Sequence, residues 1–166
     1  SFREYRHQNV EKNLIEMIDK GEILIETDGY AIGQVNALLV YVSSDFHFGI
    51  PNKITARTYV GSDGVTNIDR EAQLSGAIHD KGSMILVGLL GSMWGQEHPL
   101  SFNASITFEQ LYGEIEGDSA SCAEFYTLLS SLAEIPINQG IAITGSINQI
   151  GLVQPIGEVN AKIEGM

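Results

Sequence analysis

The sequence predicts a mixed α/β (α+β) fold, in which β-sheets pack against helices within one domain. Segments with strand-like alternation and segments with helical periodicity interleave along the chain. Apolar residues make up 43% of the sequence and charged residues 18%, a balance typical of a compact enzyme and not of a disordered chain. A chain of 166 residues is also long enough to bury one core. We assign residues 1–20 to a leading helix and boundary segment, and residues 21–166 to the domain core.

The first third of the chain contains one predicted helix and three predicted strands. Apolar residues recur at helical spacing in Val10–Lys20. Glu22–Thr27 and Gln34–Val42 are β-prone and are separated by an Asp-Gly turn, so we expect them to form a hairpin. Lys53–Val60 alternates apolar and polar residues between Pro51 and a Gly-Ser-Asp-Gly sequence, which predicts a third strand with one face in water, followed by a turn into a helix.

Two helices and a strand follow. Ile68–His79 and Met84–Trp94 have helical periodicity, although the first residues of the second segment would also suit a buried strand. Phe102–Phe108 alternates strictly and predicts a strand that leads towards Ser119.

The last third begins with a predicted helix, Ala120–Ala133, that starts immediately after Ser119. Its Ser121 and Glu124 have the spacing of a capping box. One predicted stripe of this helix contains Ala123, Tyr126, Leu129 and Ala133. Gly140–Thr144 is predicted as a buried strand with Leu152–Gln154 as its partner, and Val159–Met166 as the beginning of a final helix.

Charge and cysteine content exclude several classes of function. The formal net charge of −12 would repel a phosphate backbone or an anionic membrane surface, so we expect no nucleic-acid or membrane partner. Cys122 is the only cysteine, which excludes an internal disulfide and a cysteine-rich zinc site. No apolar run is long enough to span a membrane, and no signal peptide is visible. We therefore expect a cytoplasmic protein.

Ser119 is the candidate nucleophile. The sequence Gly117-Asp118-Ser119-Ala120-Ser121 places a hydroxyl at a turn that opens a helix, where free backbone N–H groups and the helix dipole can receive an oxyanion. Gly117 and Ala120 would let a substrate approach closely. Without further context, ordinary helix capping explains these five residues better than a nucleophile does.

Lys162 is the candidate base. It lies between apolar residues near the beginning of the last predicted helix, and both burial and a helix N-terminus lower the pKa of a lysine amine. The alternative is a surface lysine paired with Glu158 or Glu164. A second alternative for the base is a histidine; the four histidines, which lie far upstream, are His7, His47, His79 and His98.

Three sequence motifs in register decide between these alternatives. They are Glu116–Ser121, Ala142–Ser146, and Gln154–Gly157 with Lys162–Gly165. Together with the upstream Gly33–Leu38, they resemble the proteolytic domain of the Lon proteases (peptidase family S16), most closely the LonB-like branch.

The resemblance implies the fold of that domain and a serine endopeptidase that cuts unfolded or damaged proteins. Ser119 would be the nucleophile, Lys162 the base, and Thr144 the hydrogen-bond partner of the lysine. Asp118 and Glu116 match acidic positions beside the nucleophile, where they would raise the pKa of Lys162 unless they point away or burial offsets them. We expect no cofactor in this domain, because the chain has no phosphate-binding loop.

The resemblance further implies an ATPase (AAA+) module elsewhere that binds ATP and Mg²⁺, unfolded polypeptides as substrates, and a hexamer as the working state. Where relatives carry a glycine pair, this chain has Gly157-Glu158, whose extra charge would raise the pKa of Lys162. We also expect the C-terminal elements of the domain to be missing after Met166. Two other functions remain open: an inactive scaffold with the same fold, and a small-molecule amidase with the same Ser/Lys pair.

Overall fold

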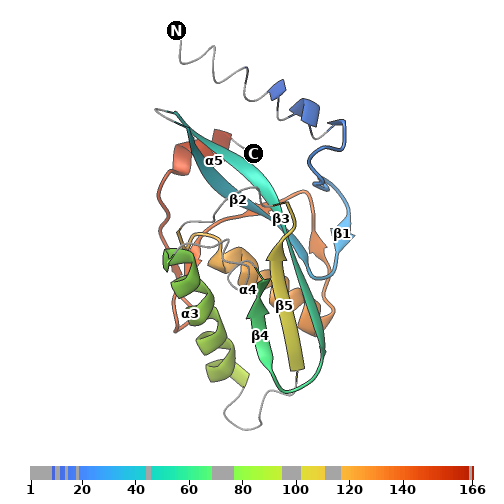
Figure 1. Cartoon of the computed structure of the whole chain (residues 1–166), viewed down its shortest axis with the longest axis vertical. Coiled ribbons are helices and arrows are strands. Elements are labelled where there is room, and N and C mark those ends of the chain that lie inside the picture. The colour runs from blue at the N-terminus through green and yellow to red at the C-terminus, as the bar shows by residue number, and fades with distance from the viewer. Residues whose placement is uncertain are drawn as a thin grey trace.

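A five-stranded mixed sheet forms the centre of the molecule in the computed structural model (Figure 1). The structure describes residues 19–43, 46–68, 77–94, 102–110, 117–164 and 166, together with positions 9, 12, 13 and 15–17. The sheet has the order β4-β5-β3-β2-β7. Its strands are β2 (Gln34–Ser43), β3 (Phe46–Val60), β4 (Gly64–Asn67), β5 (Phe102–Phe108) and β7 (Ala142–Ile143). Strand β3 is antiparallel to both β2 and β5, whereas β4 is parallel to β5 and β7 is parallel to β2.

Two short strand pairs and three helices complete the described fold. Antiparallel pairs join β1 (Tyr30–Ala31) to β6 (Ile137–Asn138) and β8 (Ser146–Ile147) to β9 (Val153–Gln154). The helices are α3 (Ala77–Trp94), α4 (Ser121–Ala133) and α5 (Val159–Glu164). The predicted mixed α/β class is therefore confirmed. The described positions before residue 20 are also helical, as expected.

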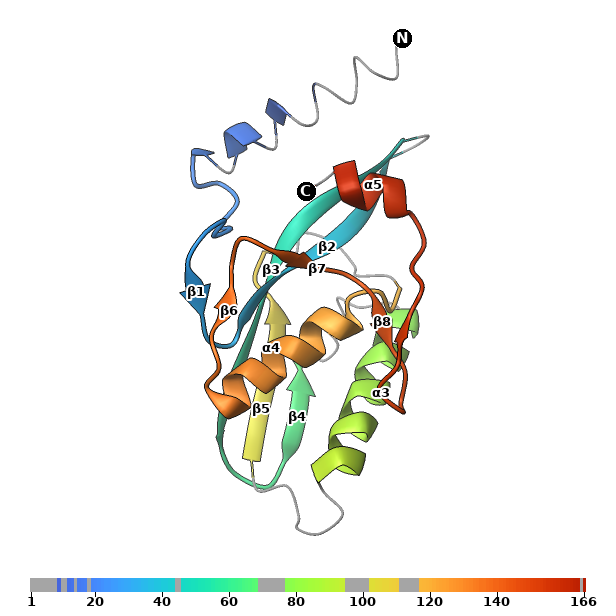
Figure 2. The ribbon, with the colours of Figure 1, turned by 180° about the vertical axis from the view of Figure 1, so that it is seen from behind.

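The helices occupy different parts of the sheet. Figure 2 shows α4 across one face of the sheet, α3 beside it, and α5 against the end of the long β2–β3 ribbon. Apolar side chains from the sheet, α3 and α4 meet in one core. Its buried members are Val35, Ala37, Ile54, Ala56, Leu86, Leu89, Leu90, Ala104, Ile106, Phe108, Ala120, Ala123, Phe125, Leu128 and Ile147.

The beginning of β2 is tied to both β3 and α4 through Gly33. Its φ of +67° lies in the region that favours glycine, and a Cβ at this position would lie 2.7 Å from the carbonyl oxygen of Ala56. The Gly33 carbonyl accepts a hydrogen bond from Ala56 N–H, and the Gly33 N–H donates to Ser130 Oγ of α4. This contact fixes the helix that follows Ser119 against the sheet.

The predicted hairpin between Glu22–Thr27 and Gln34–Val42 is wrong. Residues 24–27 form no strand, and Leu24 N–H donates instead to the side chain of Gln110. Strand β2 pairs with β3, which runs through Pro51 although we expected Pro51 to end it. Pro51 lies beyond the part of β3 that pairs with β5, so its missing N–H leaves no β5 carbonyl without a partner.

Two further expectations about connections are corrected. Gly61–Gly64 leads into strand β4 and not into a helix. Gly140–Thr144 contributes only the two half-buried residues of β7, which pair with β2, while Leu152–Gln154 contributes β9, which pairs with β8. The predicted helix Ile68–His79 lies mostly outside the described residues, and its last three positions belong to α3.

The predicted helices α3, α4 and α5 are confirmed as elements, but the buried face of α4 differs from the expected stripe. Tyr126 is 45% exposed and Ala133 is exposed, whereas Phe125 and Leu128 are buried. The capping box is also absent: the N-cap is Ala120 and makes no side-chain cap hydrogen bond. The sheet crosses α4 at an angle that apolar periodicity alone does not specify.

Candidate active site

The turn that carries Ser119 is held by backbone hydrogen bonds to the segment after β7. The Ser119 carbonyl accepts a hydrogen bond from Gly145 N–H at 2.7 Å, and the Gly145 carbonyl accepts one from Cys122 N–H at 3.1 Å. The Ser121 hydroxyl, which we expected to cap α4, accepts a hydrogen bond from Ile147 N–H at 3.0 Å. These bonds fix the half-buried Ser119 beside the residue that precedes Gly145, which is Thr144.

Lys162 brings its amine to both hydroxyls. Its Nζ lies 3.0 Å from Ser119 Oγ and 2.8 Å from Thr144 Oγ1, within hydrogen-bond distance of each. Lys162 is only 4% exposed although it lies in a short helix at the edge of the fold. The structure thus brings together the three side chains that the sequence motifs singled out, from three separate segments of the chain.

Burial and one carboxylate act on the Lys162 amine in opposite directions. Desolvation lowers the pKa of Lys162 below its ordinary value, and the negative charge of Asp118 partly offsets this by raising it. The net direction is downward, so burial is the larger effect. This resolves the conflict between a nearby acid and the low pKa that a base requires.

The remaining acidic positions have different surroundings. Glu158 pairs with His47, whose Nδ1 lies 3.2 Å from Glu158 Oε2, and the charge that raises the pKa of Lys162 belongs to Asp118. The increase in the pKa of Lys162 that we expected from Asp118 is found, whereas Glu158 is not among the groups that shift this pKa. Glu158 has a φ of 55°, in the left-handed region that favours glycine over other residues. Glu116 lies outside the described residues.

The glycine beside the nucleophile and the histidines complete the set of predicted positions. Gly117 has a φ of +86°, and a Cβ placed there would meet nothing within 4 Å, so backbone conformation is the reason for glycine here. His47 pairs with Glu158 and not with Ser119. His7, His98 and the side chain of His79 lie outside the described residues.

Sequence reasoning missed the contact that places α5. Gly49 of β3 is buried directly against the backbone of Ala161 and Lys162. The signal was a glycine inside a β-prone segment, which often marks a close approach of two backbones.

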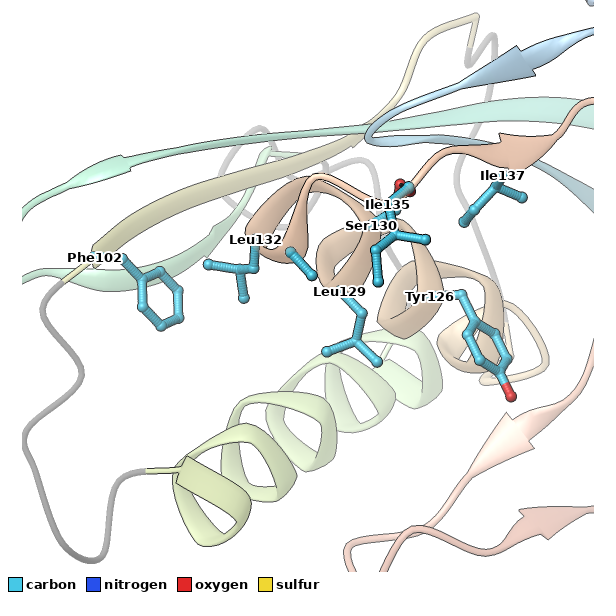
Figure 3. Close-up of a pocket in the computed structure, with 8 residues that line it drawn as sticks. Phe102, Tyr126, Leu129, Ser130, Leu132, Ile135 and Ile137 are labelled. Carbon is cyan, nitrogen blue, oxygen red and sulfur yellow. Dashed lines mark hydrogen bonds between the residues drawn. The ribbon is translucent and has the colours of Figure 1, made fainter.

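An apolar cavity of about 610 Å³ lies beside the C-terminal half of α4, whereas Ser119 precedes the beginning of this helix (Figure 3). It is lined by Phe102, Tyr126, Leu129, Ser130, Leu132, Ala133, Ile135 and Ile137. None of the three polar side chains of the Ser/Lys site lines this cavity.

Within the described ranges, no group of three or more His, Cys, Asp or Glu side chains could hold a metal ion. No helix in the same ranges is both long and apolar enough to cross a membrane.

Comparison with known proteins gives the family of this chain. Residues 113–165 match the model of the Lon protease (S16) C-terminal proteolytic domain. A putative Lon protease homolog of Escherichia coli is 46% identical over 165 residues, which is 98% of this chain and 28% of the relative. A putative Lon protease homolog of Haemophilus influenzae is 46% identical over 146 residues, 87% of this chain and 24% of the relative.

An archaeal Lon protease of Pyrococcus abyssi is 29% identical over 156 residues, 85% of this chain and 14% of the relative. The chain thus spans less than a third of the length of each of these relatives. The LonB-like branch stays a prediction. The motifs around Ser119, Thr144 and Lys162 fall within the matched regions, and the chain belongs to the Lon protease family (S16).

Proposed function

We propose that this chain is the proteolytic part of a serine endopeptidase, with Ser119 as nucleophile and Lys162 as general base. One observation carries the proposal: a buried amine with a lowered pKa lies 3.0 Å from a serine hydroxyl. A neutral amine at this distance can accept the proton of Ser119 Oγ while the oxygen attacks the carbonyl carbon of a peptide bond.

The remaining steps use groups already in place. We expect backbone N–H groups of the turn around Ser119 to stabilise the oxyanion that forms on the carbonyl oxygen, because the N–H groups of Ser121 and Cys122 already donate to the carbonyls of Asp118 and Gly145. The protonated Lys162 then gives its proton to the leaving amine, and the acyl group stays on Ser119 until water, activated by the same amine, releases it. The Thr144 hydroxyl holds the amine in the direction of Ser119.

The wider setting belongs to the same proposal. We expect unfolded or damaged polypeptides as substrates, a separate AAA+ module that uses ATP and Mg²⁺, a hexamer, and a cytoplasmic location. Residues 1–166 would form one proteolytic domain, without a cofactor of its own.

A casein digestion assay on the full-length protein tests this function. Ser119→Ala and Lys162→Ala should each abolish cleavage while the circular dichroism spectrum stays unchanged. Cleavage of short acyl substrates without cleavage of casein would favour a small-molecule amidase. Wild-type protein that cleaves neither, and whose Ser119 does not react with a fluorophosphonate, would favour a scaffold.

A further inference from the structure

The backbone of β3 contacts the backbone of α5 at Gly49. A Cβ built on Gly49 would overlap the Ala161 carbonyl oxygen, and it would lie 3.0 Å from Lys162 Cα and 3.1 Å from the Ala161 carbonyl carbon. All three nearest atoms are main-chain atoms, so no flexible side chain can move aside. The absence of a side chain at residue 49 is therefore a condition for the observed position of α5.

Helix α5 depends on such contacts for its position. A helix of six residues is too short to be stable alone, so its place is set by packing against β2 and β3. A second contact with β3 lies at its beginning, where His47 pairs with Glu158 at 3.2 Å. The Glu158 carbonyl in turn accepts a hydrogen bond from Lys162 N–H. Both contacts come from the same stretch of β3, residues 47–49.

We infer that residues 47–49 of β3 position Lys162 for catalysis, Gly49 through the close approach and His47 through the pair with Glu158. The inference rests on the proposed function and names positioning residues for it. Restoring ordinary van der Waals contact around an added Cβ requires one backbone to move by about 1 Å. Such a shift takes the amine out of hydrogen-bond distance of Ser119 Oγ, which now lies 3.0 Å away.

The displacement has a signature that loss of stability lacks. An amine moved outward regains water, so the pKa of Lys162 rises towards its ordinary value and the acid limb of the pH–rate profile moves to higher pH. A variant that is merely less stable has a smaller active fraction but keeps its acid limb in place.

The test compares Gly49→Ala with Gly88→Ala. Gly88 lies in α3, and a Cβ there would meet nothing within 4 Å, so this variant controls for a glycine-to-alanine change as such. The rate of Ser119 labelling by a fluorophosphonate is measured across pH, and the Lys162 amine is titrated by NMR on lysine-labelled chain. We expect Gly49→Ala to label about 100-fold more slowly near neutral pH, with a raised Lys162 pKa, and Gly88→Ala to match the wild type.

His47→Ala keeps the test decisive if Gly49→Ala does not fold. The His47 side chain is 42% exposed, so its removal leaves the core intact, and we expect a smaller shift of the acid limb in the same direction. A folded Gly49→Ala chain with wild-type labelling and an unmoved pKa would overturn the inference, as would an unmoved acid limb in His47→Ala when Gly49→Ala does not fold. A wild-type chain whose Lys162 pKa is low but whose Ser119 never reacts would overturn the proposed function instead.

Discussion

Replacing Thr144 by valine tests how the Lys162 amine is oriented. Valine has nearly the same shape as threonine but lacks the hydroxyl that accepts the 2.8 Å hydrogen bond from Nζ. Lys162 is 4% exposed, so water cannot readily replace this partner. Leaving a buried neutral donor unsatisfied costs about 1–3 kcal/mol, and the amine can recover part of this only by rotating away from Ser119.

We therefore expect Thr144→Val to lower kcat/KM by about 10-fold to 100-fold, since about 1.4 kcal/mol corresponds to a factor of ten. The substrate KM should change little, because the contact that the valine variant loses is the hydrogen bond with Lys162. Cleavage of a fluorogenic peptide by the full-length protein gives both constants.

Thr144→Ser is the matched control, because it retains the hydroxyl and removes only a methyl group. It should keep most of the activity. A large loss in the serine variant together with little loss in the valine variant would show that packing of the methyl group matters and the hydrogen bond does not. Full activity in Thr144→Val would refute the orienting role altogether.

Three further predictions concern stability. Burial lowers the pKa of Lys162 in the folded chain, so between the folded and the unfolded pKa the unfolded chain binds a proton more readily, and stability falls as pH decreases through this window. Lys162→Met should flatten this pH dependence. In urea titrations at neutral pH it should raise the unfolding free energy by about 1.4 kcal/mol per unit by which the pKa is lowered. Lower stability of Lys162→Met at neutral pH would contradict this. Glu158→Gly should stay within about 1 kcal/mol of wild type in thermal unfolding, whereas Glu158→Val should lose more than that, because φ is 55°; equal losses would argue against backbone strain. A hydrogen bond from Lys53 lowers the pKa of Glu26, so this pair stabilises the folded chain above the ordinary pKa of the carboxyl group, and the contribution disappears as pH falls through the folded pKa. Glu26→Gln should reduce the loss of unfolding free energy at acid pH by less than about 1 kcal/mol, because the carboxylate is 50% exposed. Unchanged acid unfolding would show that the pair contributes nothing.

Elements with strong local periodicity could be predicted from sequence, whereas strand partners could not. Phe102–Phe108 is a strand as predicted, because its alternation reflects one buried face. Gln34–Val42 was also recognised as a strand, but it was paired with the wrong segment. Pairing depends on contacts distant in sequence, and β3 provides a longer apolar partner than residues 22–27 do.

The candidate site shows the same division. Their immediate sequence neighbours predicted a capping role for Ser119 and a surface position for Lys162. The motifs in register were needed to connect the two residues across 43 positions. The burial of Lys162 depends on where α5 packs, and that depends on Gly49, which has no side chain to attract attention. The left-handed conformation of Glu158 could not be predicted either, since glutamate rarely adopts it.

The Ser/Lys site consists of two parts, and the backbone hydrogen bonds between Ser119, Gly145 and Cys122 belong to the first of them. These bonds hold the segments of Ser119 and Thr144 together, whereas α5 brings the Lys162 amine to both hydroxyls through side-chain hydrogen bonds. A displacement of α5 would therefore separate the Lys162 amine from the Ser119 hydroxyl without unfolding the rest of the site. An enzyme assembled in this way can be idle and fully folded at once, so inactivity in a purified sample is no measure of misfolding.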